Sequence, residues 1–172
     1  MKAHIRRQLT MFVEPTDGEK IETARKKFNP LQHRIIRSHL TLCREDELTD
    51  LDGVMKNLDN LKLGNLTFEV GEVERSDNGK GAVLPVYDEN NKFKNLRELL
   101  LKGMVDNPRN LKAHITIIHP RNATCTDGIF SELKKKIFPP KLTFKKISLI
   151  EQEGNNPWKI VRTIKLNVDS VN

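Results

Sequence analysis

Aromatic residues are scarce in this sequence of 172 residues, where phenylalanine, tyrosine and tryptophan together make up 5%. Proteins that hold single-stranded nucleic acid usually stack bases on aromatic rings, so this composition argues against a large stacking platform. Only two cysteines occur, Cys43 and Cys125, and they fit neither a disulfide framework nor a metal-ligand spacing. Two thiols in a chain of this size are typical of a reducing compartment, and we expect a cytoplasmic protein.

Long apolar segments are also missing. No run approaches the roughly 20 residues that a membrane-spanning helix needs, and the basic N-terminus lacks the apolar core of a signal peptide. We therefore expect no membrane partner. The chain has positive charge instead: 30 Lys and Arg against 23 Asp and Glu give a formal net charge of +7. That excess favours polyanionic or phosphorylated partners, without deciding fold or catalysis.

Apolar periodicity and turn residues predict alternating strands and helices within one domain, residues 1–172. The expected strands cover residues 4–13, 34–43, 65–75, 81–87, 111–118, 142–151 and 158–167. The expected helices cover Thr16 to Phe28 with Thr16 as N-cap, residues 45–58, residues 92–104, and residues 127–137 capped by Thr126 or Asp127. Turns at Asp77-Asn78-Gly79 and at residues 154–157 join the last two strands of each half.

One short pattern occurs twice, as Ser38-His39-Leu40-Thr41-Leu42-Cys43 and as Ala113-His114-Ile115-Thr116-Ile117-Ile118. Each is a His-x-Thr inside an apolar strand. Successive side chains of a strand point to opposite faces, so the histidine and threonine of each motif share one face and their apolar neighbours share the other. We expect two imidazoles and two hydroxyls to face a groove while the apolar residues enter the core.

Each half of the chain reads helix, His-x-Thr strand, helix, strand, turn, strand. The histidine precedes the turn asparagine by 39 residues in the first half (His39 to Asn78) and by 41 in the second (His114 to Asn155). An internal duplication explains this repeat, and duplicated units often pack about a pseudo-two-fold axis. We expect lobes of about residues 1–88 and 89–172, with both motif histidines converging on one cleft.

Other interpretations of these residues stay open. A metal site on His39 and His114 would need a third ligand, and only Cys43 lies in step with either motif. Arg44 and Arg121, just beyond the motif strands, are candidate phosphate contacts and equally ordinary surface residues. The lysine-rich stretch from Lys134 to Lys146 is typical of a solvated surface, and it could also hold RNA phosphates.

The two motifs, His39-Leu40-Thr41-Leu42 and His114-Ile115-Thr116-Ile117, resemble the signature of the 2H phosphoesterase superfamily, specifically its 2′-5′ RNA ligase-like branch. Leu149-Ile150-Glu151 before the last turn and Trp158-Lys159-Ile160 after it are also similar to that branch. The resemblance extends over about residues 4–167. It implies a bilobal, pseudo-symmetric α+β fold, with antiparallel sheets lining a central cleft and helices outside.

The resemblance also implies an activity. It is that of a metal-independent phosphoesterase or RNA ligase-like enzyme, acting without cofactor on 2′,3′-cyclic phosphate or 2′-5′ phosphodiester bonds of nucleotides or RNA ends. One histidine can be neutral while the other is charged, so His39 and His114 would serve as acid and base. Thr41 and Thr116 would donate to non-bridging phosphate oxygens.

Two rivals remain. The same cleft could belong to a non-catalytic nucleotide- or RNA-binding module, because binding and cleavage would use the same four side chains. Alternatively, the chain could be a structural domain whose partner surface is the lysine-rich hairpin.

Overall fold

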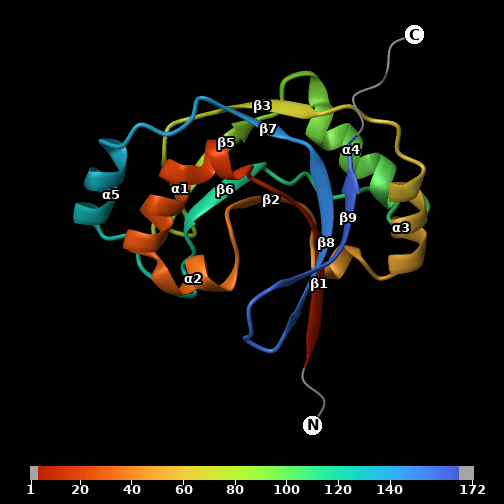
Figure 1. Ribbon diagram of the computed structural model, residues 1–172, viewed down its shortest axis with the longest axis horizontal. Helices are drawn as coiled ribbons and strands as arrows, with labels where there is room; N and C mark the ends of the chain where they lie inside the picture. Colours follow the sequence, from red (N-terminus) through yellow and green to blue (C-terminus); the bar gives the residue numbers. More distant parts are fainter. Residues whose placement is uncertain (1–3, 167–172) are drawn as a thin grey trace.

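The structure, a computed structural model, describes residues 4–166. Within this range nine strands form one curved, antiparallel sheet, and helices lie outside it (Figure 1). The strands are β1 Ile5–Phe12, β2 His39–Cys43, β3 Leu66–Val70, β4 Glu74–Ser76, β5 Gly81–Tyr87, β6 His114–Ile118, β7 Lys141–Phe144, β8 Lys146–Glu153 and β9 Lys159–Lys165. The α-helices are α1 Pro15–Phe28, α2 Pro30–Ile35, α3 Leu51–Asp59, α4 Lys92–Leu101 and α5 Asp127–Lys134, with short 3₁₀ turns at Glu45–Glu47 and Glu89–Asn91.

The strand order is symmetric about the pair of motif strands. It runs β7-β3-β5-β6-β2-β1-β8-β9, so β2 and β6 lie side by side at the centre with three further strands beyond each of them, and β4 pairs with β5. Each side of the sheet draws strands from both halves of the sequence, since β1 pairs with β2 and with β8. The predicted α+β fold, with a pseudo-two-fold arrangement and antiparallel strands, is confirmed.

Helices cover the sheet in two groups (Figure 1). Helices α1, α2 and α5 lie at one end of the molecule, where α1 contacts β6. Helices α3 and α4 pack on each other at the opposite end, where α4 contacts β2. Each central strand therefore has one long helix against its outer face. No helix within residues 4–166 is both long and apolar enough to cross a membrane.

The apolar residues of both motifs enter the core, as strand alternation predicts. Leu40 and Leu42 from β2, and Ile115 and Ile117 from β6, are at most 1% exposed. They join the cluster that fills the space between sheet and helices. Burying an aliphatic side chain of this size contributes about 1.5–3 kcal/mol, so the motif strands are anchored by their core faces.

Several predicted boundaries are wrong for identifiable reasons. Helix α1 has Glu14 as its N-cap and Pro15 in its first turn, so Thr16 is not the cap. The strand predicted from residue 34 begins only at His39, because Pro30 starts the short helix α2, where its missing N–H costs nothing. The helix predicted from residue 45 is first a 3₁₀ turn, and α3 then begins at Leu51 with Asp50 as its cap.

Other predicted boundaries, in both halves, also differ. The strands predicted at residues 65–75 and 142–151 are each two strands, β3 with β4 and β7 with β8. The predicted elements at residues 92–104, 111–118 and 127–137 exist but are shorter. Thr126 caps α5 by accepting the Ile129 N–H, as expected. Residue 167, the predicted end of the last strand, lies outside the described residues.

Candidate functional site

The two motifs meet at the centre of the sheet. Strands β2 and β6 pair antiparallel with Leu40 opposite Ile115. Continuing this register places His39 opposite Thr116 and Thr41 opposite His114, all on the face away from the core. Directly opposed residues have Cβ atoms about 4.5–5.5 Å apart, and diagonal neighbours about 7–8 Å. The two motifs thus lie on adjacent strands, with their four polar side chains on the same face of the sheet.

The two imidazoles are held in the same way. His39 Nδ1 lies 2.7 Å from the Arg37 carbonyl oxygen, and His114 Nδ1 lies 2.8 Å from the Lys112 carbonyl oxygen. A carbonyl only accepts, so each Nδ1 must carry the hydrogen and donate it. In each neutral ring the other nitrogen, Nε2, then has a free lone pair. Both histidines thus offer the same atom for proton transfer.

His39 is the more enclosed of the two. It is half-buried while His114 is exposed. The Phe12 ring, opposite it on β1, meets it edge to face with ring centroids 6.0 Å apart. The Arg37 guanidinium lies 4.7 Å from the centroid of the same Phe12 ring. Phe12 therefore closes one side of the imidazole against water.

This enclosure changes the protonation of His39. Burial lowers the pKa of His39 to about 4, although its hydrogen bond to the Arg37 carbonyl acts in the opposite direction. The charges of Arg25 and His114 lower the pKa further, and the charge of Glu22 raises it. His39 is consequently neutral at pH 7, with an unprotonated Nε2. The influence of His114 on this pKa agrees with the short separation that the register implies.

His119 is a third histidine near the motifs. Strand alternation predicts that it faces away from His114, but β6 ends at Ile118 and His119 lies in the following turn. Its backbone N–H donates to Oδ1 of the buried Asn29, and its Nδ1 accepts the Arg121 N–H. Burial lowers the pKa of His119, and the charges of Arg121, Arg6 and His114 add to that effect.

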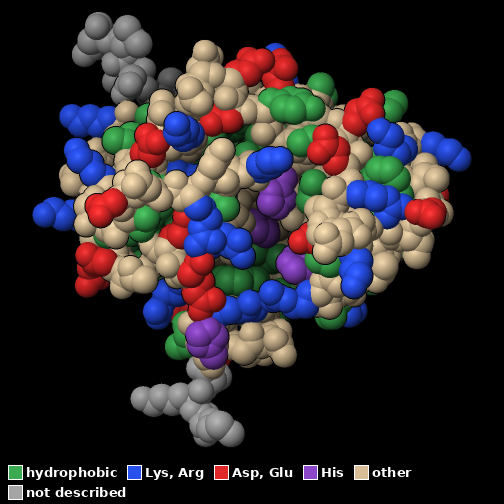
Figure 2. Space-filling model, turned by 180° about the vertical axis from the view of Figure 1, so that it is seen from behind, with side chains coloured by type: hydrophobic (Ala, Val, Ile, Leu, Met, Phe, Trp, Pro, Cys, Tyr) green, Lys and Arg blue, Asp and Glu red, His purple; other side chains and the backbone are tan. Residues whose placement is uncertain are grey.

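The face that carries these side chains is hollowed. Figure 2 shows histidine side chains gathered in a hollow at the centre of one face, with Lys and Arg side chains along its rim. On the β1 side, Arg6 donates to Gln152 and lies 5.6 Å from the centre of the half-buried Trp158 ring. Positive charge around a concave site concentrates anionic ligands there.

The two predicted arginine contacts are placed differently. Arg121 lies in the turn after β6, beside His119 and therefore at the end of a motif strand. Arg44 follows Cys43, the last residue of β2. Its backbone N–H donates to Glu47, and its charge contributes to lowering the pKa of Asp46. Both side chains are exposed. A role for either in phosphate binding stays a prediction.

A third metal ligand does not come from Cys43. That thiol is fully buried in the core, and burial raises its pKa to about 12, so it stays protonated. Among residues 4–166 there is no group of three His, Cys, Asp or Glu side chains that could hold a metal ion.

Buried charges behind the motif strands were not predicted. Arg97 of α4 forms an ion pair with Glu47, at 2.6 Å, with 3% and 4% of the two side chains exposed. Arg25 of α1, 1% exposed, donates to the Ile36 carbonyl at 2.8 Å, just before β2. Both arginines stand in the apolar stripe of their helix, and this position is the signal that the sequence held for burial.

Solved structures with the same fold are known. E. coli LigT complexed with phosphate aligns over 97% of this chain and 99% of its own, with a TM-score of 0.65 and 15% identity. A structure described as a phosphoesterase aligns over 95% and 99%, with a TM-score of 0.64 and 14% identity. The protein TT0787 of Thermus thermophilus aligns over 94% and 97%, with a TM-score of 0.60 and 16% identity.

At these identities the likeness shows the fold. The chain thus has the LigT-like fold that the resemblance of its two motifs implied. A scan of protein-family models finds no match to this chain, and a search of curated proteins finds none.

Proposed function

We propose that this chain is a metal-independent 2H-type phosphoesterase that acts on 2′,3′-cyclic phosphate or 2′-5′ phosphodiester bonds of nucleotides or RNA ends. One observation carries the proposal: the Nδ1 atoms of His39 and His114 donate to backbone carbonyls at equivalent positions, which leaves both Nε2 atoms for proton transfer. The LigT-like fold supports a phosphoesterase or RNA ligase-like function.

The two histidines take different roles in the proposed hydrolysis. His39 is neutral because burial lowers its pKa to about 4, so its Nε2 accepts a proton from water as the water oxygen attacks phosphorus. The bond from phosphorus to the leaving ribose oxygen breaks, and that oxygen takes a proton from Nε2 of His114, which must enter this step as the imidazolium. In the ligation direction the roles exchange, since the same steps run backwards.

The two threonines act on the phosphate group. Thr41 and Thr116 lie opposite the histidines on the same strand face, and each hydroxyl donates to a non-bridging oxygen. Charge on those oxygens grows as phosphorus becomes five-coordinate, so the donors stabilise the transition state more than the ground state.

Solved complexes of the LigT fold suggest the class of ligand. E. coli LigT has been crystallised with phosphate, 3′-AMP, ATP and NADP⁺. We extend nucleotide binding to this chain, whose formal net charge of +7 suits phosphorylated ligands. A cytoplasmic location, inferred from the two thiols, would give access to RNA ends and nucleotides.

The test is turnover of 2′,3′-cyclic nucleotides, and of a short RNA with a 2′,3′-cyclic end, in excess EDTA. Wild type should turn over, with a bell-shaped dependence of kcat/KM on pH. His39→Ala and His114→Ala should each lose about 100-fold or more in kcat, the size expected for removing an acid or a base. The control is His4→Ala, because the exposed His4 side chain pairs with Glu45 at the surface.

Either of two results would change the assignment. Near-full activity in both motif variants would remove the acid–base pair. Absence of turnover together with saturable nucleotide binding, lost in both variants, would favour the non-catalytic binding module instead.

A further inference from the structure

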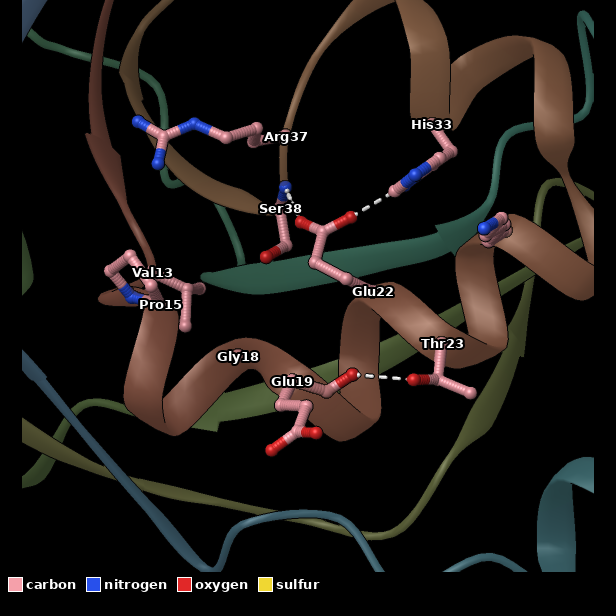
Figure 3. Close-up of a pocket in the computed structure, with 10 residues that line it drawn as sticks. Val13, Pro15, Gly18, Glu19, Glu22, Thr23, His33, Arg37 and Ser38 are labelled. Atoms are coloured by element: carbon pink, nitrogen blue, oxygen red, sulfur yellow. Dashed lines mark hydrogen bonds and ion pairs between the residues drawn. The ribbon is translucent and has the colours of Figure 1, made fainter.

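One peptide unit connects His39 to a carboxylate on helix α1. The carbonyl of Arg37 accepts from His39 Nδ1 at 2.7 Å. The N–H of the same peptide unit belongs to Ser38 and donates to Glu22 Oε1 at 2.5 Å. Figure 3 shows the Glu22 carboxylate pointing at the Ser38 backbone, while the Arg37 side chain points away from it. Glu22, this peptide unit and His39 thus form one hydrogen-bonded chain.

The surrounding contacts fix Glu22 in this position. Its second oxygen lies 2.8 Å from His33 Nδ1 on α2, and Arg25 approaches it at 3.0 Å from the next turn of α1. Arg25 also donates to the Ile36 carbonyl. The segment that leads into β2 is therefore held by two side chains of α1, one at Ile36 and one at Ser38.

The Glu22 carboxyl keeps its charge in this setting. Burial alone would raise its pKa, but the charge of Arg25 and the hydrogen bonds from Ser38 and His33 outweigh burial and lower the pKa. The cavity that exposes this carboxylate, about 310 Å³, also has Glu19, Lys26 and Arg37 in its wall. Titratable or charged residues therefore line this cavity from α1, from α2 and from the segment before β2.

We propose that Glu22 is a positioning residue that sets the orientation and proton affinity of His39 through the Arg37–Ser38 peptide unit. A carboxylate that accepts from an amide N–H polarises that amide, which makes its carbonyl a stronger acceptor for the next donor. The stronger acceptor holds Nδ1–H and stabilises the imidazolium that forms when Nε2 takes a proton. This inference rests on the proposed function for its effect on rate, but not for its effect on the imidazole.

The other motif is built differently, so this hydrogen-bonded chain distinguishes His39 from His114. The equivalent peptide unit joins Lys112 to Ala113, and its Lys112 carbonyl accepts from His114 Nδ1. In the described part of the chain no carboxylate accepts from the Ala113 N–H. A carboxylate supports only His39, the histidine that gains a proton in the proposed hydrolysis.

The experiment compares Glu22→Gln and Glu22→Asp with Glu19→Gln, which removes the same charge from the exposed face of α1 in the same cavity wall. The first readout is the imidazole ¹⁵N spectrum at pH 7, with His39→Gln assigning the signals. Wild type and Glu19→Gln should show His39 as the Nδ1–H tautomer. Glu22→Gln should show a mixture of tautomers, because its Arg37 carbonyl is a weaker acceptor.

The second readout is kinetic. Glu22→Gln should lower kcat by about tenfold with KM changed less than about twofold, the loss expected for one hydrogen-bonding group. The acidic limb of its pH profile should move to lower pH, because a negative charge that favours imidazolium is gone. Glu22→Asp keeps the charge but moves it away from Ser38, so its acidic limb should lie between those of wild type and Glu22→Gln.

The two readouts separate the possible failures. An unchanged His39 tautomer in Glu22→Gln, or an equal change in Glu19→Gln, would overturn the inference. If Glu22→Gln does not fold, Glu22→Asp provides the test. Its population of the His39 Nδ1–H tautomer should be lower than in wild type, because the shorter side chain withdraws from Ser38. If wild type has no turnover, the proposed function fails, yet the spectrum still supports or refutes the link from Glu22 to His39.

Discussion

Replacement of Arg97 by methionine should destabilise the protein by about 3 kcal/mol. Arg97 donates to Glu47 at 2.6 Å, to the Leu42 carbonyl, and to the Arg109 carbonyl at 3.1 Å. Removing one partner of a buried ion pair commonly costs about 3–5 kcal/mol, because the other charge is left without compensation. Here the Arg109 guanidinium lies 3.5 Å from Glu47 and compensates in part, which favours the lower end of that range.

The loss is measurable by urea unfolding followed by circular dichroism, with the slope of the transition checked for two-state behaviour. For a chain of this length, about 3 kcal/mol corresponds to a fall in Tm of about 6–12 °C. The matched control is Arg162→Met, because Arg162 and Asp59 form an ion pair with 45% of each side chain exposed. Exposed pairs contribute at most about 1 kcal/mol, so this variant should stay close to wild type.

The double variant Arg97→Met with Glu47→Leu tests the cause of the loss. Removing both charges leaves no uncompensated carboxylate, so the double variant should be less destabilised than the sum of the single variants by about 2 kcal/mol. If Arg97→Met cost no more stability than Arg162→Met, or if the two single losses simply added, the broken Arg97–Glu47 ion pair would not be the cause of the loss.

Two other properties of the site can be tested by substitution. Burial lowers the pKa of His39 from 6.5 to about 4, so the unfolded chain binds a proton in that window that the folded chain does not. The free energy of unfolding should therefore fall by up to about 3 kcal/mol as the pH drops from 6.5 to 4. In urea titrations over this pH range, the free energy of unfolding of His39→Gln should depend less on pH. The same pH dependence in both proteins would contradict the prediction. Thr41→Val and Thr116→Val keep the side-chain shape and should each lower kcat by about 100-fold with little change in KM. Losses below about twofold in steady-state assays would mean that the hydroxyls do not hold the transition state.

Local patterns predicted the elements of the fold better than their limits. Pro30 shows why: proline disfavours helix at the residue before it and also fits the first turn of a new helix. Asn29-Pro30 predicts a helix that ends just before it, and α1 does end at Phe28. The same proline starts α2, which occupies the residues predicted as the beginning of the β2 strand. A local pattern cannot distinguish the end of a helix from a helix end that is followed at once by a second helix.

Pairing over long distances was the part that spacing could not predict. The repeat predicted that β2 lies next to β6, and their pairing is confirmed by Leu40 opposite Ile115. It contained no signal that β1 would pair with β8, because strand partners are chosen by the global packing of apolar faces. The support of His39 was hidden for a related reason: Glu22 and Arg25 have the spacing of an ordinary surface ion pair on a helix.

The two covering helices connect the motif strands crosswise. Helix α1 packs on β6, yet its buried Arg25 holds the Ile36 carbonyl just before β2. Helix α4 packs on β2, yet its buried Arg97 holds the Arg109 carbonyl in the segment before β6. Each helix packs its apolar face on one motif strand, and its buried arginine holds the segment that precedes the other motif strand. Neither strand can therefore shift without moving a helix that also positions the other strand. In the proposed mechanism the two histidines act on opposite sides of one phosphorus atom, and such a shared frame would keep them in place, since a misplacement of about 1 Å can cost about 100-fold in rate.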